Sequence, residues 1–219
     1  SEETQIARMA DRDNFTRPVA EAMIASQMPT QQKVDRADTV FWNEGSPELL
    51  RQQILQLKAA GADGFVIGCL TAEGDLDKDA MKPLIEACGD RGITLHRCID
   101  VSRDPVQTYL DAGKLGIDTV LTSGGAGNCL AGMETIGTML QAHGPQVLIG
   151  AGVNAATIAD FRAQMPGARA FHMSGKCEIE SGMRFRREGV PMGLPGLDEW
   201  HIQQTSEDNI RAARAVLEG

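Results

Sequence analysis

Short apolar runs alternate with amphipathic runs of helical period from residue 64 to residue 174, and this rhythm constrains the fold more than any other feature. The apolar runs, which we expect to be strands, cover residues 64–70, 93–99, 119–123, 147–150 and 170–174. The runs of helical spacing cover residues 79–88, 105–112, 130–142 and 155–165. Strands that alternate with helices of this length form parallel βα units. The pattern therefore predicts an α/β fold built on a parallel sheet.

Two weaker runs, residues 5–10 and 32–36, add two expected strands at the start, each followed by a helical run that begins near Thr16 or Ser46. A last helix is expected over residues 206–217. Seven units of this kind predict a TIM-type (β/α) barrel, complete or short of its first βα unit, as a single domain over residues 1–219. A doubly wound sheet is the alternative fold, but no GxGxxG sequence follows a predicted strand.

The composition argues against several kinds of partner. The 219 residues carry 21 basic and 30 acidic side chains, a net charge of −9 with no basic run, so we expect neither nucleic acid nor an anionic membrane surface as a partner. No apolar run reaches the roughly 18 residues that a membrane-spanning helix needs. The first residues lack the features of a signal peptide, and the five scattered cysteines fit a reducing compartment, so a cytoplasmic location is expected.

Reactive side chains gather where the predicted strand 93–99 ends. Alternation places His96 on the side away from the covering helices, and Arg97 and Asp100 follow at the rim, where barrel enzymes carry their active sites. Because histidine titrates near neutral pH, His96 is the candidate general acid or base, with Arg97 or Asp100 orienting it or the substrate. His172, which alternation also turns inward, is expected to assist. The alternative is a core histidine beside a salt-bridged Arg–Asp pair.

Glycine-rich turns follow the later strands and predict an anion site. Their N–H groups can approach a ligand closely, and barrels often hold a phosphate beyond their last two strands. The candidate anion-binding residues are Ser123, Gly124, Gly125, Gly150, Gly152 and Ser174. We therefore expect a small anion as a partner, although the same glycines serve equally well as tight βα corners.

A metal site competes with the anion site for the same rim. Cys69, Cys98, His96 and His172 all fall near predicted strand ends, and soft thiol ligands favour Cu(I). However, each of the two cysteines stands alone on an apolar run, where cysteine usually packs as a core residue. The sequence also has no CxxC and no paired Cys/His spacing of a zinc site. We therefore predict no metal ligand from the residues themselves.

Several segments resemble a known family when they are taken together and in order. They are residues 61–68, 94–100, 116–125, 150–153, 171–174 and 182–186. Their residues resemble those of the copper homeostasis protein CutC family, and the resemblance covers roughly residues 48–219. It implies a TIM-barrel-like cytoplasmic protein linked to copper handling, and it makes copper a candidate cofactor on that ground alone.

The opening of the chain departs from the family pattern. The family's third strand usually ends in Arg-Pro-Arg-Gly-Gly-Asp, of which residues 34–39 keep only Arg36, our remaining candidate site residue. The cysteines proposed to bind copper in the family belong to this altered part, so the resemblance supplies no metal ligand here. If the first βα unit is absent, two sheet edges lack a neighbour, and we expect a homo-oligomer to cover them.

Three functions remain open at this point. The chain is a copper-handling protein, as in the family; or a barrel enzyme that acts on a small anionic or phosphorylated metabolite with His96 as general acid or base; or an assembly component without activity. A metal held by Cys or His would indicate the first function, and an anion held at the glycine turns would indicate the second.

Overall fold

The computed structural model describes residues 2–13, 16–37, 40–41, 46–187, 189–190 and 200–219. The chain divides into two compact units. The larger unit comprises residues 46–177 and 205–219, and the smaller unit comprises residues 1–45 and 178–204. We describe each unit by itself, and the expected single domain over residues 1–219 stays a prediction.

The larger unit is built on a five-stranded parallel sheet in the order β1-β2-β3-β4-β5, so every strand pairs with its neighbours in sequence. The strands are β1 (Gly64–Ile67), β2 (Gly92–Leu95), β3 (Thr119–Thr122), β4 (Gln146–Ile149) and β5 (Ala170–Phe171). In register, Ile67 pairs with Leu95, and Thr122 with Ile149. The carboxyl ends of the strands therefore lie along one edge of the sheet.

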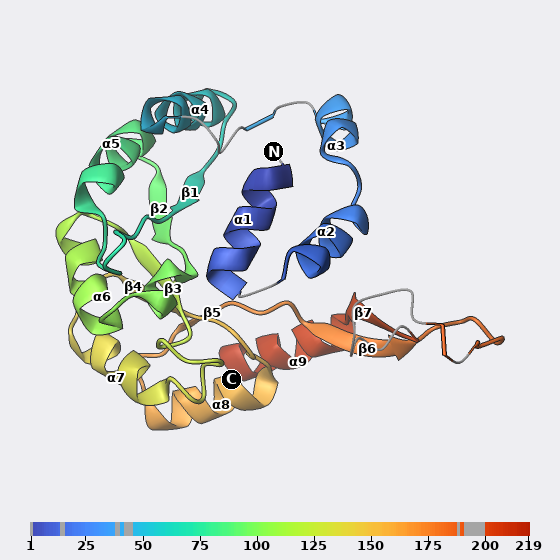
Figure 1. Ribbon diagram of the computed structural model, residues 1–219. Helices are drawn as coiled ribbons and strands as arrows, with labels where there is room; N and C mark the ends of the chain where they lie inside the picture. Colours follow the sequence, from blue (N-terminus) through green and yellow to red (C-terminus); the bar gives the residue numbers. More distant parts are fainter. Residues whose placement is uncertain (1, 14–15, 38–39, 42–45, 188, 191–199) are drawn as a thin grey trace. The chain divides into compact units, whose positions relative to one another are not determined.

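One helix precedes β1 and one helix follows each of β1 to β4, and these helices pack on the same face of the curved sheet (Figure 1); a last helix covers residues 207–218. The helices are α4 (Pro47–Ala59), α5 (Lys78–Cys88), α6 (Pro105–Lys114), α7 (Met133–Gln141), α8 (Ala155–Gln164) and α9 (Glu207–Glu218). The core lies between the two layers, with Leu95, Val120 and Ile149 from the strands fully buried against helix residues such as Met81 and Phe161. Successive parallel strands with outer helices confirm the predicted α/β fold of the (β/α) barrel type.

The predicted helices of this unit are confirmed, but several strands are shorter than expected. The strand predicted over residues 93–99 ends at Leu95, because the 3₁₀ helix η1 (Arg97–Val101) begins directly after it. The strand predicted over residues 170–174 keeps a ladder only at Ala170 and Phe171. The predicted alternation of side chains is still present in the shortened strand β2, where Ile93 and Leu95 are buried and Thr94 is partly exposed.

The two strands predicted near the start of the chain are wrong, because both segments are helical. Residues 5–10 belong to α1 (Glu2–Asp13), in which Ile6 and Met9 stand three apart on one face and acidic residues occupy the first turn. Residues 32–36 belong to α3 (Thr30–Arg36), which places Arg36 in a last helical turn instead of at a strand's end. Helix-forming residues and helical spacing therefore outweigh the weak apolar alternation that suggested strands. Of the seven expected units, five are present in the described residues.

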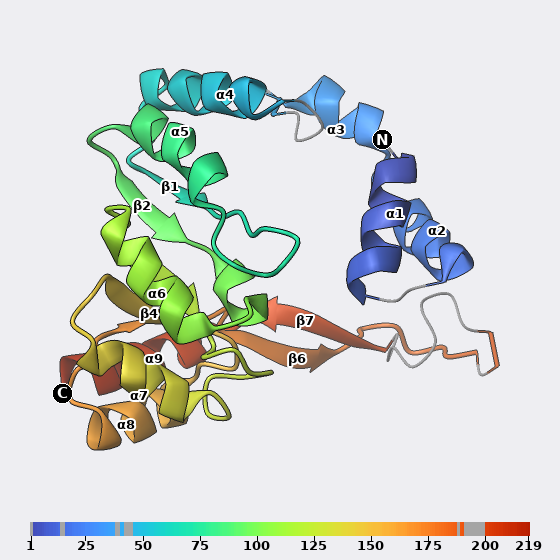
Figure 2. The same ribbon diagram turned by 60° about the vertical axis from the view of Figure 1, so that its left-hand side comes forward.

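The smaller unit contains α1, α2 (Arg17–Ala25), α3 and most of a two-stranded ribbon that the sequence did not predict. Arg17 joins the first two helices, since its guanidinium bonds Glu3 of α1 at 2.6 Å and Glu21 of α2 at 2.7 Å. The ribbon pairs β6 (Lys176–Glu180) with β7 (His201–Thr205), and its course is clearest in Figure 2. Of the irregular stretch expected over residues 189–196, residues 191–196 lie outside the described part.

The helices of the described part were also compared with the dimensions of a bilayer. None of them is both long enough and apolar enough to cross a membrane.

Candidate functional site

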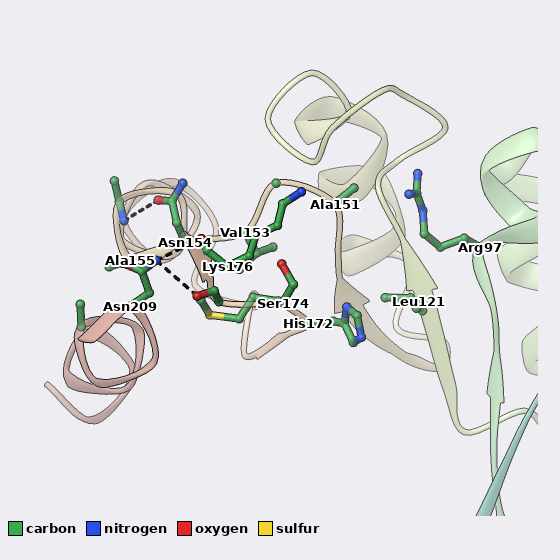
Figure 3. A pocket seen from close by; sticks show the side chains of 15 residues that line it. Arg97, Leu121, Ala151, Val153, Asn154, Ala155, His172, Ser174, Lys176 and Asn209 are labelled. Carbon is green, nitrogen blue, oxygen red and sulfur yellow. Dashed lines mark hydrogen bonds between the residues drawn. The ribbon is translucent and has the colours of Figure 1, made fainter. Parts of the chain in front are cut away.

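A cleft of about 760 Å³ opens at the carboxyl ends of the last strands of the larger unit. Its walls come from the β4–α8 loop, from the residues that follow β5, and from the first turns of α9 (Figure 3). Arg97 and Leu121 close the opposite side. This is the volume of a typical small-molecule site, and it lies at the edge where barrel enzymes bind their ligands.

The lining of the cleft is positively charged although the chain carries a net charge of −9. Arg97 and Lys176 supply this charge, His172 also lines the cleft, and none of its 15 described lining residues is an Asp or a Glu. Within the part of the chain that the structure describes, the ammonium group of Lys176 has no acidic partner. A cationic hollow on an acidic protein attracts small anions.

Arg97 enters the cleft from the start of η1 and is held along one edge of its guanidinium. Its Nε donates to Asp100 Oδ2 at 2.6 Å, and its Nη2 donates to the Ser123 hydroxyl at 2.8 Å. The side chain remains 45% exposed, while that of Asp100 is 5% exposed. The guanidinium is therefore fixed in orientation, and its Nη1 side stays open to a ligand.

Asp100 is the centre of a hydrogen-bond network that joins η1 to the turn after β3. Its Oδ1 accepts from the Thr122 hydroxyl at 2.5 Å, from Ser123 N at 2.9 Å and from Gly125 N at 3.1 Å. Burial by itself raises the pKa of Asp100, but the hydrogen bonds from Thr122, Arg97, Gly125 and Ser123 outweigh it and hold the pKa below its usual value. Asp100 thus stays charged and positions Arg97, and it does not line the cleft.

The turn after β3 was expected to bind an anion, but its N–H groups already have partners within the chain. Ser123 N and Gly125 N donate to Asp100, and Gly124 N donates to the Thr122 hydroxyl at 2.8 Å. A Cβ on Gly124 would collide with the carbonyl of Gly132, so the turn also packs tightly on the segment before α7. These three residues do not line the cleft.

The β4–α8 loop forms one wall of the cleft, and it contains Gly150 and Gly152, which the sequence predicted to bind an anion. Gly150 is buried and continues the ladder by donating to Thr122 O at 2.9 Å, whereas Gly152 is exposed in the cleft. Ala151, with φ 69°, and Gly152, with φ 78°, both adopt left-handed backbone conformations. Such a conformation is strained for alanine, and the bond from Cys129 N to Ala151 O at 2.9 Å helps to hold it.

The start of α8 completes this wall. Asn154 caps the helix by accepting from Ala156 N at 2.9 Å and from Thr157 N at 3.1 Å. Among the described residues, no acceptor faces the N–H groups of Gly152 and Val153. Two backbone donors and a helix N-terminus therefore border the cationic cleft.

Every second residue after β5 is exposed in the cleft, and the sequence analysis identified two of these three residues. His172 and Ser174 were predicted there and are exposed in the lining, and Lys176 continues the same period of two. Gly175 between them is buried with φ 59°, and a Cβ at this position would collide with Ile210 of α9. The alternation itself was the signal that could have identified Lys176.

Asn209 in the first turns of α9 is the other lining residue that the sequence did not indicate. Its Nδ2 donates to Lys176 O at 3.1 Å and to Gly175 O at 3.3 Å, which fixes the chain beside the cleft (Figure 3). Asn209 lies far from these residues in sequence and carries no local motif. Only the folded chain reveals its position.

His96, the predicted acid or base, is half-buried and does not appear among the described residues of the lining. Its Nδ1 accepts from Cys98 N at 3.1 Å, so the ring caps η1. A Cβ on Gly68 would lie 2.6 Å from Cys98 Sγ and 2.8 Å from His96 Cε1, which places these side chains together at the end of β1. The structure therefore places Arg97 and His172 in the lining of the cleft. His96 lies outside this lining, near Gly68 at the end of β1.

The thiols near His96 are protonated under ordinary conditions. Burial, with a smaller contribution from the neighbouring Cys69, raises the pKa of Cys98 to about 11. Burial also raises the pKa of Cys69. Among the described residues, no group of three or more His, Cys, Asp or Glu side chains is arranged to hold a metal ion. Arg36 belongs to the smaller unit and is exposed in α3.

Comparisons with known proteins agree on one family. The family model described as CutC family matches residues 19–177. A CutC family protein of Porphyromonas gingivalis is 33% identical over 204 residues, which is 92% of this chain and 82% of that protein. A CutC family protein of Xanthomonas campestris is 44% identical over 141 residues, which is 64% of this chain, and the match spans only 58% of that protein's length.

A solved structure shares the fold. It is a Streptococcus agalactiae protein named as a copper homeostasis protein CutC, with a TM-score of 0.54 and 19% identity over 62% of this chain and 68% of that chain. The resemblance inferred from the sequence segments is thus confirmed by the family model and by the relatives. The chain belongs to the CutC family.

Proposed function

We propose that the cleft binds a small anionic metabolite, such as a phosphate ester, and that the chain acts on it as a (β/α)-barrel enzyme. The observation that supports this most is the charge of the lining: Arg97 and Lys176 both line the cleft, without a carboxylate among the described lining residues. Backbone donors of Gly152 and Val153 border the same space. Together these groups compensate the desolvation of a buried anion.

The chemistry that fits this site is proton transfer on the bound anion. His172 projects into the middle of the cleft from the end of β5 and is exposed there (Figure 3), so it is placed to exchange a proton with a ligand. Arg97 and Lys176 stabilise negative charge that develops on the ligand. The role of His96 as acid or base stays a prediction, and it would use Nε2, because Nδ1 accepts the hydrogen bond from Cys98 N. Asp100 acts as a positioning residue for Arg97.

The test is equilibrium binding of inorganic phosphate, measured by calorimetry at low salt. We expect Lys176→Met to weaken binding about ten-fold or more, since it removes a charged partner. The matched control is Lys82→Met, which removes an exposed lysine of α5 that pairs with Asp79 at 3.6 Å. Phosphate that binds equally well to both variants would contradict the proposed site.

A role in cytoplasmic copper handling is the second candidate. It is favoured by the name of the Streptococcus agalactiae relative and by the neighbouring thiols of Cys69 and Cys98 at the ends of two adjacent strands. All five cysteines are free thiols, as a reducing compartment requires. Cu(I) bound at this pair would have to displace a proton from a thiol whose pKa is about 11, so we propose that any such binding is weak.

We also propose that the chain forms a homo-oligomer. In the described part, β1 and β5 each pair with a single strand of the main sheet, and unpaired strand edges favour association. Val66 of β1 is 64% exposed, which leaves apolar surface at one of these edges. A second copy of the chain would cover it.

A further inference from the structure

We infer that the ligand of the cleft carries an anionic group at each end, a phosphate near Lys176 and a carboxylate at Arg97. This inference rests on the proposed anion site and narrows it to one class of molecule, the phosphorylated small carboxylic acids.

The Arg97 end is built for a planar, two-oxygen group. Of the five guanidinium N–H donors, one on Nε and one on Nη2 are used by Asp100 and Ser123. The three donors that remain are two on Nη1 and one on Nη2, and such paired guanidinium donors match the geometry of a carboxylate. Because Asp100 and Ser123 fix the guanidinium from behind, this edge needs little reordering when a ligand binds.

The Lys176 end suits a phosphate. An ammonium group is a compact charge without a planar preference, and here it accompanies the unpartnered N–H groups of Gly152 and Val153. The ten-residue helix α8 begins in the same wall, and its N-terminal dipole adds to the attraction for negative charge. A tetrahedral, multiply charged group can use donors from several directions at once.

The two ends are separate. Figure 3 shows Arg97 on one side of His172, and the segment of Ser174, Lys176 and Asn209 on the other. Leu121 lines the cleft on the same side of His172 as Arg97, and its side chain adds apolar surface there. A single small anion has one charged group to offer, whereas a ligand with two charged ends can pair with both cations at once. His172 then faces the carbon atoms between the two groups.

The experiment compares two ligands that differ only at one end, phosphoglycerate and glycerol phosphate, by calorimetry on the whole chain. We expect phosphoglycerate to bind about ten-fold more tightly or better, because a charge-assisted pair with Arg97 is added. In Arg97→Met this preference should disappear, because phosphoglycerate then loses the partner of its carboxylate. Arg97→Lys keeps the charge and serves as a second variant if Arg97→Met is unstable; it should lose most of the preference.

Lys176→Met removes the cation at the other end of the cleft and is compared with Arg97→Met. It should weaken both ligands by the same factor and keep their ratio. Equal binding of the two ligands to the unaltered chain, or a preference that survives Arg97→Met, would overturn the inference and leave the proposed anion site standing. Failure of phosphate, glycerol phosphate and phosphoglycerate alike to bind would instead overturn the proposed function.

Discussion

The Thr122 hydroxyl donates a 2.5 Å hydrogen bond to Asp100 Oδ1 and so joins the end of β3 to the helix η1 that follows β2. The same carboxylate accepts from two backbone N–H groups and from Arg97. One nearly buried charge therefore fixes both the β3 turn and the guanidinium that enters the cleft. Loss of this charge should affect stability and ligand binding together.

Asp100→Asn should lower the free energy of unfolding by about 2–4 kcal/mol, because an amide nitrogen would face donors that now meet a buried carboxylate oxygen. Urea denaturation measures the change. The control is Asp104→Asn, which alters the N-cap of α6, where Asp104 accepts from Gln107 N at 3.0 Å. Asparagine caps helices as well as aspartate does, so a similar loss in both variants would show that Asp100 has no special role.

The pH dependence of stability follows from the same residue. Hydrogen bonds hold the pKa of Asp100 below its usual value in the folded chain, despite the opposing effect of burial. A depressed pKa adds stability above the unfolded-state value of about 3.9 and loses it as the pH falls through the folded-state value. Between pH 7 and pH 3, unfolding free energy should therefore fall more steeply in the unaltered chain than in Asp100→Asn. Parallel curves would contradict this assignment.

Gly175→Ala should cost about 2 kcal/mol or more, because a left-handed backbone and a collision with Ile210 both oppose a side chain there. Ile210→Val shortens the colliding group and should recover the steric part in the double variant, but not the backbone part. Gly127→Ala is the control, since no atom lies within 4 Å of its added Cβ. Thermal or urea unfolding of the three variants decides between strain and simple loss of a glycine.

Copper binding can be tested by competition with a Cu(I) chelator. We expect no tight one-to-one complex at neutral pH, because a thiol with a pKa of about 11 must lose its proton to bind the metal. Cys98→Ser should then leave the titration unchanged, as should Cys177→Ser, which alters the half-buried thiol of β6. A stoichiometric complex that is lost in Cys98→Ser alone would show that the rim thiols form a copper site.

Association of the chain can be followed by light scattering on dilution. We expect a mass above that of one 23.5 kDa chain at micromolar concentration, because β1 and its exposed Val66 offer an edge to a second copy. Val66→Lys should shift the equilibrium toward the monomer, since a charged edge residue opposes strand pairing. A chain that stays monomeric at every concentration, with unchanged stability, would rule out the homo-oligomer.

The sequence predicted the βα rhythm of residues 64–174 well, because strong apolar periodicity and caps such as Asn154 act locally. It misassigned residues 5–10 and 32–36, where short segments with weak alternation have helical propensity. It also expected the N–H groups after β3 to face a ligand. That they bond Asp100 depends on contacts between residues more than 20 apart in the chain, which no local pattern reveals.

The most direct test of the anion site is a phosphate titration followed by NMR of ring-labelled histidine. His172 lines the cleft, whereas His143 precedes β4 at the other end of the strands. We predict that the ring signals of His172 move and saturate as phosphate is added, that those of His143 stay in place, and that Lys176→Met moves the saturation to a phosphate concentration about ten-fold higher or more. Signals of His172 that do not respond, or a response shared equally by His143, would contradict a phosphate site in this cleft.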